Sequence, residues 1–178
     1  TSALSVAGSK LTAAGGSATL AVPTPEIADA NVRFAVTTSL AGTTTRQVID
    51  WGSAAGDYAL DFSGLLMPTI GGLALDLSTV ELTWTEGSGA APDLSLGTMW
   101  FDGDPNVSTW RIVAPHTAGA LQLPPIPGLL PSTAPVQLEL ILAQVPGGYD
   151  AVRETAFALS PTFISGASGR SLVAAMDQ

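Results

Sequence analysis

The stretch that decides the fold is STVELTWTEGSGAAPDLSLGTMWFDGDPNVSTWRIVAP, residues 78–115, which holds three of the four tryptophans. Apolar and polar residues alternate over 79–85, where Leu82 and Trp84 fall on one face. Successive side chains of a strand point to opposite faces, so this alternation predicts a strand with one buried and one exposed face.

The alternation resumes twice within this stretch, over 93–101 and 107–113. Each resumption follows Gly, Asp, Ser or Asn residues, which favour turns because they supply positive φ or bond their own backbone. Trp110 and Ile112 share the expected inward face of the third segment. Burial on one face only is typical of antiparallel sheets. The stretch therefore predicts three consecutive antiparallel strands.

Short apolar runs outside this stretch predict further strands. The longest, 136–145, becomes apolar on both faces in its second half, which predicts a central or covered strand. Pro and Gly at 146–148 predict a turn, and 171–176 predicts one helical turn. The other predicted strands are 17–22, 31–40, 45–51, 57–62, 73–77, 119–123 and 154–159.

Composition limits the classes of function. The 178 residues carry a net charge of −9 with six basic residues, so we expect no nucleic-acid partner, because such binding needs clustered Lys and Arg. Without cysteine, disulfides and thiolate metal sites are excluded. No apolar run approaches the roughly 18 residues of a membrane span. The Thr/Ser/Gly/Ala-rich, lysine-poor composition leads us to expect an exported, extracellular or cell-surface protein, and the start at Thr1 is expected to be a mature or trimmed N-terminus.

The predicted fold class is an all-β, antiparallel β-sandwich. Thirteen prolines and nineteen glycines between short apolar runs favour sheets over helices. The Gly-rich segment 63–72 is the best candidate for a boundary between two domains. We therefore expect an N-terminal β segment over 1–66, either separate or packed into one larger sandwich, and a second β-sandwich over 67–178.

Residues of about 70–165 resemble a fibronectin type III-like, immunoglobulin-like sandwich with seven strands. Trp84 resembles the buried tryptophan of the family's second strand, and Leu121, Leu123 and Pro124 resemble its leucine-proline signature before the sixth strand. The tyrosine that usually opens the sixth strand is absent, since Pro135 stands there. This departure leaves other seven-stranded sandwiches open, as well as one larger sandwich that includes the N-terminal segment.

The run WRIVAP at 110–115, followed by LPPIP at 123–127, is also similar to modules of large surface or lipoprotein-like proteins of Gram-negative bacteria. The resemblance implies adhesion, spacing or ligand presentation. Because a fold does not fix a function, this implication is an analogy.

Catalytic residues are scarce, and we predict no catalytic site and no enzymatic activity. The single histidine, His116, follows a predicted strand and is expected to be a surface loop residue. No G-x-S-x-G motif is present, because Gly166-Ala167-Ser168-Gly169 has the wrong spacing. One histidine without cysteine gives too few ligands for a zinc site.

A weak calcium candidate lies in the turn Asp102-Gly103-Asp104-Pro105-Asn106. Oxygens at alternate positions, from Asp102, Asp104 and Asn106, can converge on a hard cation such as Ca²⁺. The distal bidentate Glu of a calcium loop is absent, and an Asx-stabilised turn explains the same residues. We expect no other cofactor.

Exposed aromatic rings are the candidates for ligand binding, because sugars stack on Trp and Tyr. Trp51 beside a loop and Tyr149 in a Gly-rich turn are the best candidates, and Trp100 and Trp110 are weaker because they are expected to face inward or each other. The alternative for all four is a role in the core.

These patterns favour a non-enzymatic extracellular β-sandwich module for adhesion, spacing or contact with a protein or glycan. The alternative is a self-assembling shell or filament subunit, since edge strands normally carry lysine to block pairing and the chain has one lysine. A hydrolase is the third candidate, and it would need two close carboxylates in a deep pocket.

Overall fold

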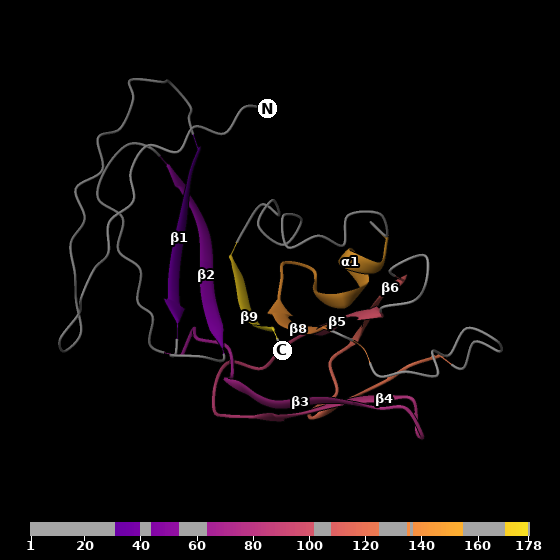
Figure 1. Ribbon diagram of the computed structural model, residues 1–178. Helices are drawn as coiled ribbons and strands as arrows, with labels where there is room; N and C mark the ends of the chain where they lie inside the picture. Colours follow the sequence, from indigo (N-terminus) through magenta and orange to yellow (C-terminus); the bar gives the residue numbers. More distant parts are fainter. Residues whose placement is uncertain are drawn as a thin grey trace.

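A computed structural model of the protein describes residues 31–39, 44–53, 64–101, 108–124, 135, 137–154 and 170–177 (Figure 1). These residues form nine strands and one short helix. In chain order they are β1 (Asn31–Ser39), β2 (Thr45–Ser53), β3 (Ile70–Asp76), β4 (Glu81–Glu86), β5 (Leu94–Phe101), β6 (Ser108–Pro115), β7 (Ala120–Gln122), β8 (Gln137–Gln144), α1 (Gly148–Glu154) and β9 (Ser171–Asp177).

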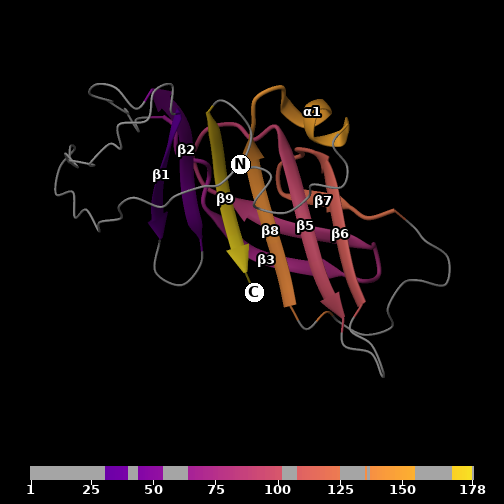
Figure 2. The same ribbon diagram turned by 90° about the horizontal axis from the view of Figure 1, so that it is seen from above.

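The strands form two sheets, and every pairing is antiparallel. The larger sheet has six strands in the order β1-β2-β9-β8-β5-β6, and the smaller has three in the order β3-β4-β7. Figure 2 shows the three-stranded sheet lying behind the larger one, while α1 packs on the opposite side. The predicted all-β sandwich is confirmed, and strands from both predicted segments, β2 and β9, pair in one sheet.

Strand β8 shows how alternation builds both sides of the larger sheet. Leu138, Leu140 and Leu142 join the main core cluster between the two sheets, whereas Ile141 and Ala143 join a second cluster beneath α1. The prediction of a central strand that is apolar on both faces is therefore confirmed. Burial on both faces excludes water from a strand that is already hydrogen-bonded to β5 and β9.

Residues 78–115 form the three strands that their alternation predicts, β4, β5 and β6. Leu82 and Trp84 of β4 are buried in the main cluster. Trp110 of β6 packs against the same cluster and meets the ring of Phe101 edge-on, with 5.8 Å between the ring centroids. Trp110 and Ile112 thus face inward, as expected.

One prediction about the C-terminal part is wrong. Residues 171–176 form β9 rather than a helical turn, because β9 fills the place between β2 and β8 and hydrogen-bonds to both. The pattern of a short apolar run rich in alanine does not distinguish a helical turn from a strand. The predicted strand 154–159 begins at Glu154, which instead ends α1; the rest of that strand lies outside the described residues, as do 17–22 and 57–62.

Helix α1 begins where the chain turns at Gly147 and Gly148, which both have positive φ. Val152 on the helix is 4 % exposed and belongs to the cluster with Leu94 and Ile141. Burial of this side chain explains why a helix of only seven residues is stable, since short helices depend on tertiary packing.

The two sheets approach closely at Gly97 in β5. A Cβ atom at this position would lie 2.9 Å from Cδ2 of Leu82 and 3.2 Å from Cδ2 of Leu121, both in the opposite sheet. Gly97→Ala is therefore expected to lower the free energy of unfolding by about 1–2 kcal/mol through overpacking. Urea unfolding measures the change, with Thr109→Ala at an exposed position of β6 as control. A loss no larger than that of the control would contradict this packing.

The turn between β3 and β4 depends on the exposed carboxylate of Asp76. Its Oδ1 atom accepts hydrogen bonds from the Ser78 hydroxyl at 2.6 Å, the Ser78 backbone N–H at 2.7 Å and the Thr79 N–H at 3.3 Å. The Ser78 hydroxyl is the main cause that lowers the pKa of Asp76, and the backbone bonds add to it. The turn ends at Val80, which has a positive φ of 57°.

A lowered pKa in the folded state gives a stability contribution with a definite sign. It is fully present above the unfolded pKa of Asp, about 3.9, and is lost as the pH falls through the lower folded value. We expect Asp76→Asn to destabilise the protein slightly at pH 7, and the difference from the wild type to shrink toward about pH 2. Urea midpoints at both pH values test this; an equal difference at both would contradict it.

Candidate functional site

The single histidine lies between a hydroxyl and a carboxylate at one end of the sandwich. Nδ1 of His116 is 2.9 Å from Oγ of Ser95 on β5, and Nε2 is 3.5 Å from Oε2 of Glu86 at the end of β4. The His116 side chain is 14 % exposed, so the expectation of a surface loop residue is wrong. Because β4 and β5 belong to different sheets, this Ser95–His116–Glu86 chain connects the two layers.

Several further contacts hold the chain in place. Oε1 of Glu86 accepts hydrogen bonds from the Trp84 indole N–H at 2.6 Å and from the Gly119 backbone N–H at 3.1 Å. The backbone N–H of His116 donates to the carbonyl of Asp93 at 3.1 Å. The Glu86 carboxylate thus contacts three groups: the indole N–H of Trp84, the backbone N–H of Gly119 before β7 and the imidazole of His116.

The Ser95–His116–Glu86 chain contains the three groups of a serine hydrolase, but not their working arrangement. In such a triad the serine meets Nε2 of the histidine and the acid meets Nδ1, whereas the contacts here are exchanged. Ser95 is 1 % exposed and lies on a strand paired on both sides, opposite Ala114 and Leu142. This hydroxyl is therefore almost inaccessible from solvent, and its contacts join the two sheets.

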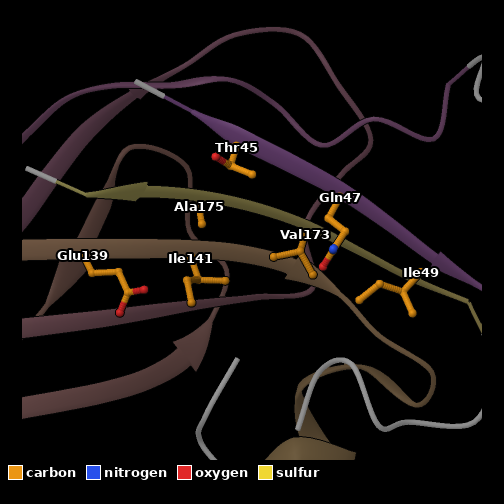
Figure 3. Close-up of a pocket in the computed structure, with 7 residues that line it drawn as sticks. All are labelled: Thr45, Gln47, Ile49, Glu139, Ile141, Val173 and Ala175. Atoms are coloured by element: carbon orange, nitrogen blue, oxygen red, sulfur yellow. The ribbon is translucent and has the colours of Figure 1, made fainter. Parts of the chain in front are cut away.

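A hollow lies on the outer face of the six-stranded sheet, beside the part that α1 covers (Figure 3). Its volume is about 170 Å³. Figure 3 shows side chains from β2, β9 and β8 projecting on this side of the sheet. The lining residues are Thr45, Gln47, Ile49, Glu139, Ile141, Val173 and Ala175.

Strand register explains how distant parts of the sequence meet in this hollow. Gln47 pairs with Val173 across β2 and β9, and Ile141 pairs with Ala175 across β9 and β8. Directly opposed residues of neighbouring strands project to the same face. The alternate residues of the three strands therefore line one surface.

The hollow has an apolar floor and a more polar rim. Ile49 and Ile141 are each 1 % exposed, while Val173 and Ala175 are half-buried. Thr45 at the rim is exposed. Ligand pockets for drug-sized molecules usually have volumes of about 300–1,000 Å³. A hollow of this size suits one or two inserted side chains better than a free small molecule.

Two of the predicted aromatic site residues, Trp100 and Trp110, lie on opposite faces of the larger sheet. Trp110 faces the core between the sheets, whereas Trp100, which lies between the inward Met99 and Phe101, projects from the other face and is half-buried. Tyr149 of α1 packs on the second cluster. The side chain of Trp51 in β2 lies outside the described residues.

The predicted calcium ligands Asp102, Asp104 and Asn106 also lie outside the described residues. Within the described part of the chain, no group of three or more His, Asp or Glu side chains could hold a metal ion. No helix in that part is long and apolar enough to cross a membrane.

The sequence contains a partial signal for the contacts among Ser95, His116 and Glu86, which the sequence analysis did not predict. Glu86 lies two positions after Trp84, so both side chains leave β4 on the same side, and His116 directly follows β6. The β5–β6 register, which pairs Ser95 with Ala114, brings that end of β6 beside Ser95. For the hollow no comparable signal exists, because Val173 and Ala175 lie on the strand that was predicted to be helical.

Comparison of the chain with protein-family models, with curated proteins and with solved structures finds no match.

Proposed function

We propose that this protein is a non-enzymatic β-sandwich module that contacts another protein through the hollow between β2, β9 and β8. The observation that carries the proposal is the apolar floor of Ile49, Ile141, Val173 and Ala175 beneath a rim that includes exposed Thr45. An apolar centre with a polar rim is the usual anatomy of a protein contact.

The state of Ser95 supports a non-catalytic role. A nucleophile must reach its substrate, and this hydroxyl is 1 % exposed and hydrogen-bonded to His116. The chain of polar groups that it begins ends on Glu86, whose other oxygen is already engaged by two donors. These contacts favour a structural function for the only histidine in the sequence.

The order of strands β3 to β9 supports a fibronectin type III-like or immunoglobulin-like module. Lettered in chain order, β3, β4 and β7 take the places of A, B and E in one sheet, while β5, β8 and β9 take those of C, F and G in the other. In this assignment β9 is the last strand, β6 is an extra strand beside C, and β1 and β2 extend the sheet beyond G. Modules of this kind suit adhesion or spacing outside the cell, which is where we place the protein.

Charge and aromatic placement narrow the class of partner. The net charge of −9 favours a partner with a basic contact surface, because complementary potentials speed encounter and disfavour wrong partners. A glycan is less favoured, because Trp100 and Trp110 project from opposite faces of the sheet and cannot stack on one sugar chain. The proposed partner is therefore a protein that inserts apolar side chains flanked by basic residues.

The test is selection of peptides from a displayed library on the wild-type protein, followed by affinity measurement with two matched variants. Thr45→Trp covers the hollow from its exposed rim, whereas Thr109→Trp places the same side chain at an exposed position on β6. We expect selected peptides to bind Thr45→Trp at least about tenfold more weakly and Thr109→Trp like the wild type, because blocking a central contact removes most of the binding energy.

Equal binding to the wild type and to Thr45→Trp would show that the hollow is not the contact surface. Hydrolysis of ester or peptide substrates that disappears in Ser95→Ala would show that the non-enzymatic assignment is wrong. Light scattering of the purified protein distinguishes the proposed module from a self-assembling shell or filament subunit, because such a subunit would form large species at high concentration.

A further inference from the structure

Two buried polar atoms belong to directly opposed residues of the paired strands β1 and β2. Thr38 is directly opposite Arg46 in the register of these strands. The Oγ1 atom of Thr38 and the Nε atom of Arg46 are both sealed from solvent, and neither has a hydrogen-bond partner. Buried polar groups are nearly always hydrogen-bonded, so two orphaned atoms on opposed residues require an explanation.

These side chains lie on the face of β2 that is opposite to the hollow. Val48, two positions after Arg46, belongs to the main cluster between the sheets. Residues two apart on a strand share a face, and directly opposed residues do so as well, so Arg46 and Thr38 face the side of the three-stranded sheet. Across β2 and β9, Arg46 is opposite Ala174, which also belongs to the main cluster.

The charge of Arg46 is not neutralised by a carboxylate of the described residues. The exposed Arg170 is 2.6 Å from Asp50, and the exposed Arg153 is 3.4 Å from Asp150. Arg46 is half-buried, yet no ion pair joins it to an acid in the described part of this strongly acidic chain. Because the Nε atom of this guanidinium is removed from water without a partner, an acceptor at that position would stabilise it.

We propose that Arg46 and Thr38 form a binding site for a small oxyanion, such as a carboxylate, sulfate or phosphate. The Nε–H of the guanidinium and the hydroxyl of Thr38 each donate a hydrogen bond to an oxygen of the same anion. A guanidinium matches two oxygens of a carboxylate or phosphate in its plane, and the hydroxyl adds a donor from the neighbouring strand. A single anion would satisfy both orphaned atoms and neutralise the charge. This site is separate from the hollow and does not depend on the proposed function.

The experiment follows the Nε–Hε signal of Arg46 in ¹⁵N-labelled full-length protein by NMR. Sodium sulfate, sodium phosphate and sodium acetate are added in separate titrations, with sodium chloride keeping the ionic strength constant. We expect a saturable shift of the Arg46 signal with at least one of these anions. Saturation with sulfate or phosphate alone identifies a tetrahedral ligand, and saturation with acetate alone identifies a carboxylate.

Three variants define the donors. Thr38→Val removes the hydroxyl with little change in shape, and we expect binding about tenfold weaker, because a hydrogen bond to a charged group is lost. Arg46→Met should abolish binding, whereas Arg111→Met, which removes an exposed arginine from β6, should leave it unchanged. If Arg46→Met does not fold, Thr38→Val decides the outcome alone.

Two results would overturn the proposal. One is a shift of Arg46 that stays linear in anion concentration and equals that of Arg111, which would indicate ordinary ionic screening. The other is unchanged affinity in Thr38→Val, which would show that the hydroxyl does not contact the anion and that a water molecule satisfies it.

Discussion

Leu140→Ala is expected to lower the free energy of unfolding by about 3–5 kcal/mol, the largest effect that we predict for a single substitution in this protein. Leu140 is fully buried at the middle of β8, in the main cluster between the sheets. Its cross-strand neighbours are Gly97 on β5 and Met176 on β9. Gly97 has no side chain to fill the space, and β8 is hydrogen-bonded on both sides, so the cavity cannot collapse.

Urea unfolding followed by tryptophan fluorescence measures this loss, because four tryptophans report on the fold. Gln137→Ala is the matched control, since Gln137 is an exposed residue at the start of the same strand. A loss below about 1 kcal/mol for Leu140→Ala would mean that the site repacks, and that the two sheets are less tightly joined than the structure indicates.

Local alternation was enough to predict β8 and its two-faced burial, but not the neighbours of that strand. Leu138, Leu140 and Leu142 reveal their shared face by spacing alone. The strand that pairs with them through Met176 could not be identified in the same way, because its run of small apolar residues fits either a helical turn or a strand. Residues 171–177 form a strand because they pair with both β2 and β8, which are distant in the sequence. No local pattern describes such long-range pairing.

The candidate site was harder to predict than the fold for the same physical reason. Ser95, His116 and Glu86 come from three different segments, and their contacts depend on how one sheet covers the other. A lone histidine after a strand looks like an exposed loop residue unless the opposite layer is known. The aromatic residues were weighed by their position in the sequence, whereas the alternation around Trp100 and Trp110 already places them on opposite faces.

Glu86→Ala is expected to lower the free energy of unfolding by about 2–4 kcal/mol. This is a large effect for a charged residue at the end of a strand, here β4 of the three-stranded sheet. Its removal leaves the Trp84 indole N–H and the Gly119 N–H without their acceptor, and it separates His116 from its acid. Each buried donor that loses its partner costs about 1–3 kcal/mol, so the total follows from the two donors with partial relief by water.

Glu86→Gln separates the geometric role of the carboxylate from its charge. The amide oxygen can still accept from the Trp84 indole and from Gly119, so we expect this variant to retain at least half of the stability that Glu86→Ala loses. Ser95→Ala is the third comparison, because it removes only the hydroxyl that meets Nδ1 of His116. If Glu86→Gln were as damaging as Glu86→Ala, the negative charge opposite His116 would matter more than the two N–H donors, and the imidazole would be the centre of the network that joins the sheets.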